Sequence, residues 1–386
     1  MNIVHFTPHL PPDQAANALL PFQLGEWARR RGDDVVFIAH PPLQQSAPPP
    51  DGVITIARTR RGVLQRVLRA GSVAGAWRIR RIATPVVSDA DVVHIHSNGL
   101  LPEVGAAVAR RLHKPAVLTL YGTEIWHYRP KRIDLFTRAY RGASAVTFYS
   151  QGLLDRAREL GLDRPGLHVV YPPVAASFRH HDETERDRER AALGITAGRL
   201  LVNVKRLHPL AGQRFLLAAM PSVLRQHPDT HLVICGTGAL LGELQAVARS
   251  SGVERQVTFA GLVDNRLVAR YCAAADLFVL PSLLEALPTV AVEALASGTP
   301  VVSSDNPGGI ELNRVFGDDV RVVPRENSEA LAEAIADRLR AGTRTQPETR
   351  VTIEERFRAD GVARQYWEIY EEAMRGARAG LRPGRS

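Results

Sequence analysis

The sequence predicts an α/β protein in which two Rossmann-like domains face each other across an interdomain cleft. The chain has 386 residues, more than one hydrophobic core usually serves. Short β-rich apolar runs alternate with helical segments, a pattern typical of parallel sheets that helices cover on both faces. The alternation stops at a strongly charged segment near the middle of the chain and then restarts, which indicates a second domain of the same kind.

The first domain is predicted over residues 1–177. Its first helix signal covers residues 15–31, and its strand signals are residues 3–6, 34–39, 91–96, 116–120, 143–149 and 169–171. The first six residues lack a basic leader and a long apolar run, so we predict neither a signal peptide nor a membrane anchor.

Residues 178–190 are almost all charged, and we interpret residues 178–195 as the interdomain crossing and the start of an exposed helix. The second domain is predicted over residues 196–350. Its strand signals are residues 200–204, 231–235, 257–259, 277–280, 300–302 and 320–323, and helix signals at 212–225, 241–250, 267–274, 289–296 and 328–340 lie between them. A return helix at about 351–375 and a disordered basic tail at 376–386 complete the predicted chain.

Composition bounds the class of protein. Cys235 and Cys272 are the only cysteines, so neither a disulfide framework nor a cysteine-based zinc site is expected, and a reducing cytoplasm fits. No apolar run approaches the roughly 20 residues that span a bilayer. The formal net charge of +9 indicates a solvated surface, or attraction to phosphate groups or to an anionic membrane. We predict a cytoplasmic protein, possible peripheral contact with the inner membrane face, and no nucleic-acid partner, and leave the oligomeric state open.

The stretch 280–302 carries two glutamates separated by seven residues. Glu285 lies in the loop after a predicted strand, Pro288 suits the first turn of the next helix, and Glu293 lies inside that helix. A helix N-terminus presents unpaired N–H groups and a positive dipole end, which is typical of a diphosphate site. Carboxylates there can accept hydrogen bonds from sugar hydroxyls and from a ribose diol. The alternative is two exposed glutamates on a helix surface.

Here the chain resembles the retaining glycosyltransferases of family 4, which have the two-domain GT-B architecture. The pair Glu285 and Glu293 matches the family's Glu-x7-Glu motif, although Ala286 stands where the family usually has glycine. The resemblance covers nearly the whole chain. It implies that Glu285 contacts the donor sugar as a catalytic residue and that Glu293 contacts the nucleoside ribose.

Residues 202–213 resemble the family's Gly-Arg-Leu-x3-Lys-Gly loop. The resemblance implies that Arg206 is catalytic and binds the donor diphosphate, whose charge an arginine can neutralise without a metal. Lys205 stands where the family has glycine, and Ala211 stands where it has lysine. We therefore expect Lys205 to contribute to donor binding, although neighbouring residues on a strand face opposite ways.

Further segments match the family's donor domain. Gly236 and Gly238 follow a predicted strand, residues 257–263 resemble the segment whose backbone reads the base, and residues 306–311 resemble the family's Gly-Gly loop. The remaining residues expected to bind the donor are Gly261, Leu262, Pro288 and Thr289.

The N-terminal domain is expected to hold the acceptor. Residues 119–124 resemble the family's Thr-x-His-Gly-x-Asp segment, with Tyr121 in place of histidine and Glu124 in place of aspartate. The family histidine approaches the donor sugar, so Tyr121 is the third candidate catalytic residue, one that hydrogen-bonds but carries no charge at neutral pH. Asp13, Glu103 and Glu124 are the candidate carboxylates for an acceptor, or else they are solvated surface groups.

No metal site is predicted. Asp89 and Asp91 form an Asp-x-Asp sequence directly before a buried strand, and we interpret it as a turn. His94 and His96 alternate on that strand, but no nearby carboxylate or cysteine completes a ligand set. We therefore interpret them as histidines of the core or of the cleft edge.

The resemblance implies a nucleotide-sugar donor, with a UDP-sugar expected, no cofactor, and retention at the anomeric carbon of the transferred hexose or aminohexose. Residues 203–213 and the arginine-rich composition also resemble transferases of aminoglycoside antibiotic biosynthesis, whose acceptors contain 2-deoxystreptamine. The alternative acceptor is a lipid-linked glycan, which the arginine-rich amphipathic segment 59–84 favours.

Two other classes of protein stay open. Residues 236–242 miss the spacing of a dinucleotide-binding glycine motif by one residue, so an NAD-dependent oxidoreductase is one alternative. A non-catalytic subunit that binds sugar nucleotides is the other, because Tyr121 and Ala211 depart from the family's pattern.

Overall fold

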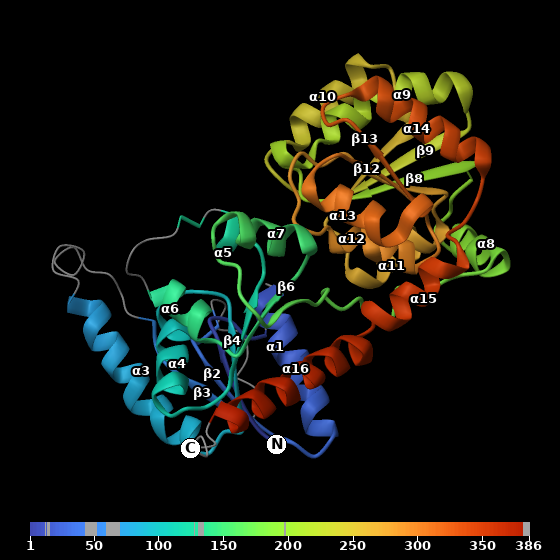
Figure 1. The fold of residues 1–386 in the computed structure, drawn as a ribbon. Coiled ribbons are helices and arrows are strands. Elements are labelled where there is room, and N and C mark those ends of the chain that lie inside the picture. Colours follow the sequence, from blue (N-terminus) through green and yellow to red (C-terminus); the bar gives the residue numbers. More distant parts are fainter. Residues whose placement is uncertain are drawn as a thin grey trace. The chain divides into compact units, whose positions relative to one another are not determined.

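The computed structural model describes residues 1–11, 13, 16–42, 52–58, 70–126, 128–129, 135–196 and 198–380. The chain forms two compact units: Met1–Pro172 together with the segment from Ala359 onward, and Pro173–Arg358. Each unit is built on its own parallel sheet packed by helices (Figure 1). The predicted α/β class with two Rossmann-like domains is confirmed.

The first unit contains a seven-stranded parallel sheet with the strand order β3-β2-β1-β4-β5-β6-β7. Because β1 and β4 are neighbours in this sheet, the direction of winding reverses between them. The strands are β1 (Asn2–Thr7), β2 (Asp34–Ala39), β3 (Val53–Thr55), β4 (Val92–His96), β5 (Ala116–Leu120), β6 (Ala145–Phe148) and β7 (Leu167–Val169). The helices are α1 (Ala16–Arg30), α3 (Ala70–Ser88), α4 (Leu100–Arg111), α5 (Thr123–Trp126), α6 (Leu135–Gly142), α7 (Gln151–Glu159) and α16 (Ala359–Gly380).

The second unit contains a six-stranded parallel sheet with the order β10-β9-β8-β11-β12-β13. Its strands are β8 (Arg199–Val204), β9 (Thr230–Cys235), β10 (Val257–Gly261), β11 (Leu277–Leu280), β12 (Val301–Ser304) and β13 (Val320–Val323). Its helices are α8 (Glu183–Ala192), α9 (Gln213–Gln226), α10 (Leu241–Ser250), α11 (Asn265–Ala274), α12 (Thr289–Ala296), α13 (Pro307–Phe316), α14 (Ser328–Ala341) and α15 (Pro347–Arg356), with short 3-10 turns η1 (Pro209–Ala211), η2 (Glu254–Gln256) and η3 (Gly317–Asp319).

The central strands explain why the sequence shows apolar runs rather than alternation. Every residue of β4, β5 and β6 is buried in the first unit, as is every residue of β11 and β12 in the second. A strand with helices on both faces has no solvent side, so it needs apolar residues throughout. The polar side chains His94, His96, Thr119 and Thr147 are the exceptions within β4, β5 and β6, and they are fully buried.

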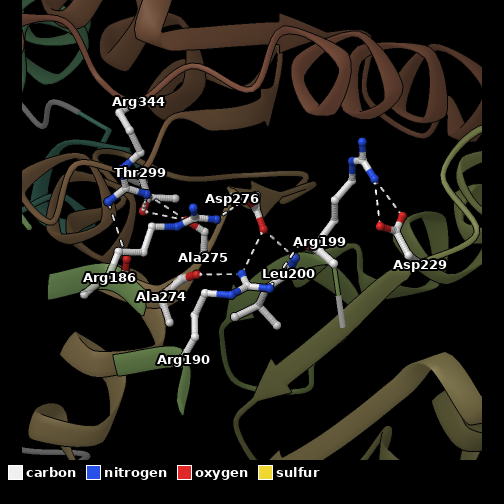
Figure 2. Close-up of polar contacts among 12 residues, drawn as sticks. Arg186, Arg190, Arg199, Leu200, Asp229, Ala274, Ala275, Asp276, Thr299 and Arg344 are labelled. Atoms are coloured by element: carbon white, nitrogen blue, oxygen red, sulfur yellow. Dashed lines mark hydrogen bonds and ion pairs between the residues drawn. The ribbon is translucent and has the colours of Figure 1, made fainter. Parts of the chain in front are cut away.

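The segment interpreted as the interdomain crossing belongs to the second unit. The chain passes from the first unit to the second at Pro172 and Pro173, and α8 is docked beyond that point. No residue of α8 is buried, but Arg186 and Arg190 both pair with Asp276, which precedes β11 (Figure 2). Ion pairs rather than apolar burial thus hold α8 in place. The charged residues that suggested a linker are the residues that attach this helix to the second unit.

Asp276 ties α8 to the sheet. Its Oδ2 atom accepts a hydrogen bond of 2.6 Å from the backbone N–H of Leu200 and lies 3.1 Å from Nη1 of Arg190 (Figure 2). We expect Asp276→Ala to destabilise the second unit by about 2–4 kcal/mol, because it removes the carboxylate that two partly buried guanidinium groups and the Leu200 N–H share. Urea unfolding monitored by hydrogen exchange of the β8 amides measures this loss.

Asp337→Ala is the matched control for that substitution. Asp337 pairs with Arg340, but both side chains are more than half exposed, at 69% and 63%. Exposed ion pairs contribute about 0–1 kcal/mol, so the control is expected to unfold almost like the unsubstituted protein. Equal unfolding midpoints for the two variants would contradict the anchoring role of Asp276.

The predicted return helix over 351–375 is wrong in its extent. The structure has two helices there, α15 and α16, separated at Phe357 and Arg358. Phe357 is fully buried and its carbonyl oxygen accepts a 2.7 Å hydrogen bond from the N–H of Val174, while Arg358 donates to the carbonyl oxygen of Phe178 at 2.9 Å. This pairing with a segment about 180 residues earlier interrupts the helix. Helix α16 then continues to Gly380, so the first residues of the predicted tail are helical, and 381–386 lie outside the described residues.

Other predictions about the first unit can be placed. The Asp-x-Asp sequence lies in the turn before β4, where Oδ2 of Asp91 accepts a 2.8 Å hydrogen bond from the N–H of Asn2. Of the arginine-rich segment 59–84, residues 59–69 lie outside the described residues and the rest belongs to α3. Among the described helices, none combines the length and apolarity that crossing a membrane requires.

Candidate functional site

The donor-site residues predicted in the second unit lie at or after the carboxyl ends of β8, β9, β10 and β11. Strands β8 and β11 are paired neighbours in the sheet, although β9 and β10 come between them in the sequence. The winding of the sheet therefore reverses between β8 and β11. In open α/β sheets a ligand binds outside the carboxyl ends of the strands at such a switch point. The loops that follow β8 and β11 therefore lie where a nucleotide is expected.

Two predicted glycines allow these loops to approach closely. The N–H of Gly236 donates to the carbonyl oxygen of Gly261 at 2.7 Å, which joins the ends of β9 and β10. A Cβ atom on Gly236 would lie 2.1 Å from the carbonyl oxygen of Lys205, and one on Gly238 would lie 2.2 Å from that of Leu207. Any side chain at either glycine would therefore push away the loop that carries Arg206.

Lys205 and Glu285 are brought together. The Nζ atom of Lys205 forms an ion pair with Oε1 of Glu285, and both side chains are partly buried. Lys205 follows Val204, the last residue of β8, so the alternation of a strand does not decide where its side chain points. Ala211 is buried and carries no charge, so Lys205 supplies the cation beside Glu285.

Arg206 is exposed, and its backbone is held in place. The Nε2 atom of the buried Gln213 donates to the carbonyl oxygen of Arg206 at 3.4 Å. Within the described chain, no residue pairs with the guanidinium group of Arg206. Its planar fork of N–H donors is thus available for an anionic group such as a phosphate.

The N-terminus of α13, which follows β12, supports the backbone of Glu285. The N–H of Gly308 lies 2.9 Å from the carbonyl oxygen of Glu285, and a Cβ atom on Gly308 would lie 2.8 Å from Cβ of Glu285. Asn306 caps α13 with Oδ1 and donates from Nδ2 to the carbonyl oxygen of Ser282 at 2.8 Å. The segment that resembles the family's Gly-Gly loop, residues 306–311, is therefore the N-cap and first turns of α13, and it holds the loop that carries Glu285.

Helix α12 has the bounds that the sequence predicts, Thr289–Ala296. Pro288, expected in the first turn, is the N-cap residue, because its backbone is extended at φ −80° and ψ 95°. The first helical residue is Thr289, and no side chain caps the helix. An uncapped N-terminus leaves backbone N–H groups and the positive dipole end for an anion, as the sequence predicts.

Glu293 lies one turn into α12 in a partly buried position. Burial raises the pKa of its carboxyl group from 4.5 to about 7. The group is thus held near the point where it gains or loses a proton at neutral pH, which is typical of functional sites.

This raised pKa makes a prediction about stability. A group whose pKa is higher in the folded state stabilises the fold fully below its unfolded pKa, and this contribution is lost as the pH rises through the folded pKa. We expect Glu293→Gln to leave the free energy of unfolding nearly unchanged at pH 4.5 and to increase it by about 2–3 kcal/mol at pH 8. Urea unfolding across this pH range measures the difference. Glu333→Gln, at an exposed position of α14, is the control and should show no such slope.

In the first unit, Tyr121 follows β5 and is partly buried. Its hydroxyl oxygen lies 2.8 Å from Nδ1 of His96, and its ring packs edge-on against Tyr149 with 4.7 Å between centroids. Burial raises the pKa of the Tyr121 hydroxyl well above 10, so the group stays protonated. Tyr121 is therefore a neutral hydroxyl held from behind by an imidazole.

Glu124 differs from the prediction that it contacts an acceptor. The side chain is buried, and its Oε1 accepts a hydrogen bond from the hydroxyl group of Ser97. Its Oε2 accepts from the backbone N–H groups of Tyr121 at 3.3 Å and Gly122 at 2.9 Å. The carboxylate of Glu124 is engaged in hydrogen bonds to Ser97 and to the turn that carries Tyr121, so Glu124 positions this turn.

The other two predicted acceptor carboxylates also have internal partners. Oε1 of Glu103, in the first turn of α4, accepts a 3.2 Å hydrogen bond from the N–H of Gly99. Oδ2 of Asp13 lies 2.8 Å from Nδ1 of His9, and the Asp13 side chain is only 7% exposed. Each of these contacts is local in the sequence. In the described chain, no contact joins Asp13, Glu103 and Glu124 to one another, so they do not form one acidic cluster.

The histidines of β4 are joined by His5, which sequence reasoning missed. His5 on β1 is the register partner of His94, and all three histidines are fully buried. Their ring nitrogens lie within 4.8 Å of one another, and this triad is the one described group of such residues that could hold a metal. His94, however, shares hydrogen bonds with the hydroxyls of Tyr370 and Thr119, at 2.6 and 2.7 Å. This arrangement agrees with the interpretation of His94 and His96 as core histidines.

Comparison with known proteins identifies the family. Residues 22–178 match the model of Glycosyltransferase Family 4, and residues 185–358 match that of the glycosyl transferases group 1. TuaC of Bacillus subtilis, a glycosyltransferase assigned to teichuronic acid biosynthesis, is 34% identical over 280 residues, which are 69% of this chain and 67% of TuaC. The chain belongs to glycosyltransferase family 4. It is a nucleotide-sugar-dependent glycosyltransferase with the GT-B fold.

Other relatives of this family 4 glycosyltransferase differ in substrate. The GDP-mannose-dependent phosphatidylinositol monomannoside mannosyltransferase of Mycolicibacterium smegmatis is 29% identical over 287 residues, 72% of this chain and 71% of that protein. Among solved structures, HepE of Anabaena in complex with UDP has a TM-score of 0.73 at 20% identity and covers 96% of this chain and 100% of its own. The galactosyltransferase WaaB of the lipopolysaccharide outer core has a TM-score of 0.68 at 14% identity, covering 97% and 99%.

A signal for His5 was present in the sequence of this glycosyltransferase. The first strand signal, residues 3–6, is apolar except for His5. In the strand signal 91–96, His94 and His96 are the polar residues that follow Asp91. Polar residues inside strands that are buried on both faces need partners. Two such strands in a Rossmann-like order are neighbours, so His5 and the pair on β4 could have been expected to meet.

Proposed function

We propose that this family 4 glycosyltransferase moves a hexosyl or aminohexosyl group from a UDP-sugar to an acceptor hydroxyl, with retention at the anomeric carbon. The observation that carries the proposal is the switch point of the second unit. There, Arg206, which has no partner in the described chain, the Lys205–Glu285 ion pair and the uncapped start of α12 follow two neighbouring strands. Such an arrangement supports binding of a diphosphate beside a sugar.

The proposed roles follow from charge and position. Arg206 and the N-terminus of α12 bind the diphosphate and stabilise the negative charge that grows on it as the glycosidic bond breaks. When the hydroxyls of the donor sugar bind to Glu285 in place of Lys205, the Lys205 ammonium group pairs with the diphosphate instead. Lys205 and Arg206 are then two cations that neutralise the diphosphate, so the protein requires no metal. Glu293 accepts hydrogen bonds from the ribose, and Tyr121 contacts a substrate oxygen from the first unit.

A front-face route accounts for retention. The acceptor hydroxyl attacks on the side that the diphosphate leaves, and a departing phosphate oxygen takes up the proton of that hydroxyl. The transition state has oxocarbenium character. Glu285 then acts on the donor sugar without forming a covalent bond to it, and Arg206 is the larger source of stabilisation because it faces the developing charge.

The nucleoside of the donor is proposed to be uridine. HepE binds UDP, and its fold is that of this chain, whereas the mycobacterial relative depends on GDP-mannose. Gly261 and Leu262 at the end of β10 are proposed to contact the base, and the Leu262 side chain is 83% exposed and open to a ligand.

Thermal unfolding with a panel of UDP-, GDP- and dTDP-sugars tests the donor. A ligand at 100 times its Kd adds about 2.7 kcal/mol to the free energy of unfolding, so a matching donor raises Tm clearly. We expect the largest rise with a UDP-sugar, and slow release of UDP from it by hydrolysis. A rise with GDP-sugars alone would overturn the choice of uridine. Binding without any hydrolysis or transfer would favour the non-catalytic subunit.

For the acceptor, the observations favour a lipid-linked glycan over a 2-deoxystreptamine aminoglycoside. The carboxylates expected to bind a polycation have internal partners, as described above. Helix α3 instead exposes Val73 at 71% and Trp77 at 62%, and Arg78, Arg80 and Arg81 are exposed on the same helix. Apolar side chains flanked by arginines suit the surface of an anionic membrane, where a lipid-linked acceptor resides.

Sedimentation with vesicles separates the two acceptors. Binding to phosphatidylglycerol vesicles but not to phosphatidylcholine vesicles, with a loss of binding in Trp77→Ser, supports the lipid-linked acceptor. Val351→Ser, at a position 55% exposed in the second unit, is the control and should still bind. If the protein ignores anionic vesicles and a 2-deoxystreptamine aminoglycoside accelerates UDP release, the aminoglycoside acceptor is correct.

A further inference from the structure

A buried chain of hydrogen bonds leads from His5 on β1 to Tyr121. The Nδ1 atom of His5 on β1 lies 2.9 Å from Nε2 of His96 on β4. The Nδ1 atom of His96 in turn lies 2.8 Å from the hydroxyl oxygen of Tyr121, which follows β5. Both histidines have no exposed surface, whereas Tyr121 is only partly buried. Tyr121 is thus the end of the chain that a substrate can reach.

His94 belongs to a separate branch. Its ring nitrogens are engaged by the hydroxyls of Tyr370 and Thr119, and the Thr119 hydroxyl lies 2.7 Å from that of Thr147. This branch fastens helix α16 to β4, β5 and β6. In the described residues no hydrogen bond joins it to Tyr121, although the rings of His94 and His96 lie 3.9 Å apart between centroids.

His5 and His96, the two histidines of the chain that leads to Tyr121, are neutral. Burial lowers the pKa of His5 to about 3 and holds that of His96 well below 6.5. A neutral imidazole carries one N–H donor and one nitrogen acceptor. Only two arrangements of the whole chain are then possible, one the reverse of the other.

The far end of the chain distinguishes the two arrangements. If His5 donates from Nδ1, then His96 donates from Nδ1 to Tyr121, and Nε2 of His5 carries a lone pair. If the chain runs the other way, Nε2 of His5 must carry the proton. This Nε2 atom is buried and has no hydrogen-bond partner in the described structure. A buried N–H without an acceptor is the rarer case in proteins, so donation runs from His5 toward Tyr121.

We propose that His5 and His96 are positioning residues that set the polarity of Tyr121, whose hydroxyl accepts from His96 and therefore donates its own proton to an oxygen of the bound substrate. The inference rests on the proposed function, in which Tyr121 contacts substrate. Donors in series polarise one another, so the Tyr121 hydroxyl becomes a stronger donor. It suits an oxygen that only accepts at that point, such as a phosphate oxygen or the ring oxygen of a sugar.

The same histidines could bind a metal only by giving up these contacts. A zinc ion shared by His5, His94 and His96 needs one free nitrogen on each ring. Apart from Nε2 of His5, the ring nitrogens of the triad share hydrogen bonds with each other or with Tyr121, Tyr370 and Thr119. Metal binding is therefore a competing outcome that the experiment below can detect.

The first test reads the tautomers directly. The full chain is labelled with nitrogen-15 histidine, and His5→Gln and His96→Gln identify the two signals among the 13 histidines. We expect the proton on Nδ1 in both rings, unchanged in Tyr121→Phe. Protons on Nε2, or one equivalent of zinc bound by the triad, would overturn the proposal. This readout needs no activity, so it stands apart from the fate of the proposed transferase function.

The second test is a double-mutant cycle on hydrolysis of the UDP-sugar. We expect Tyr121→Phe and His96→Leu each to lower kcat/KM roughly 3- to 10-fold, the value of one hydrogen bond, and the double variant to lose no more than Tyr121→Phe alone. His96→Gln, which keeps an N–H donor, should restore part of the loss. Tyr370→Phe is the control, since it removes a hydroxyl from the other branch. Additive losses, or an equal loss in Tyr370→Phe, would mean that the histidines act only on the fold.

Discussion

Glu285→Gln is expected to lower the turnover of the UDP-sugar about 30- to 1,000-fold while the protein stays folded. The substitution keeps the shape and one oxygen acceptor but removes the charge. In the free protein this charge pairs with Lys205, and with donor bound it would accept hydrogen bonds from sugar hydroxyls. Steady-state kinetics of UDP release, with the donor at saturation, measures the effect.

The variant must also be shown to keep its nucleotide site. UDP itself lacks the sugar, so we expect UDP to raise the Tm of Glu285→Gln as much as that of the unsubstituted protein. The Asn306 loop supports the backbone of residue 285 and not its carboxylate, so the fold should not change. Glu333→Gln, an exposed glutamate on α14, carries the same change of charge and should turn over normally. Near-normal turnover of Glu285→Gln would refute its assignment.

The fold of this glycosyltransferase could be predicted because its information is local. Buried parallel strands need mostly apolar residues, and short apolar runs are visible in β4, β5, β11 and the first half of β12 without knowledge of the neighbouring strands. The grouping of the candidate donor-site residues could be predicted for a related reason. These residues occupy loops directly after strands, and the carboxyl ends of parallel strands in one sheet meet at the same edge.

Other features could not be predicted, because contacts distant in sequence decide them. Glu124 looks like an exposed loop carboxylate until Ser97, 27 residues earlier, donates to it. The charged segment of α8 looks like a linker until Arg186 meets Asp276, 90 residues later. In both cases residue type alone allows a solvated and a paired state, and tertiary structure selects the paired one.

Lys205 shows how a local rule can mislead. Alternation along a strand argues against Lys205 and Arg206 acting on one ligand, because adjacent side chains point to opposite faces. The structure ends β8 at Val204, so both residues lie in the loop, where this rule does not hold. The ion pair with Glu285 then gives Lys205 a definite place beside the proposed donor sugar.

Arg206→Ala should have an effect of similar size on the bond-breaking step, with a different signature. Removing one preorganised donor to a developing oxyanion costs about 10²- to 10³-fold in kcat. Because Arg206 also binds the diphosphate of the ground state, we expect UDP to lose roughly tenfold or more in affinity, which Glu285→Gln does not show. Isothermal titration with UDP and hydrolysis kinetics measure the two effects separately.

Charge alone cannot replace the arginine if this proposal is right. Arg206→Lys keeps the positive charge but loses the planar fork of donors, so it should recover only part of the kcat. Arg266→Ala removes an exposed arginine from α11 of the same unit and should change neither quantity. If Arg206→Ala binds UDP as tightly as the unsubstituted protein, then the diphosphate lies elsewhere. The switch point between β8 and β11 would then not be the donor site, because Arg206, the Lys205–Glu285 pair and the start of α12 were assigned to one ligand.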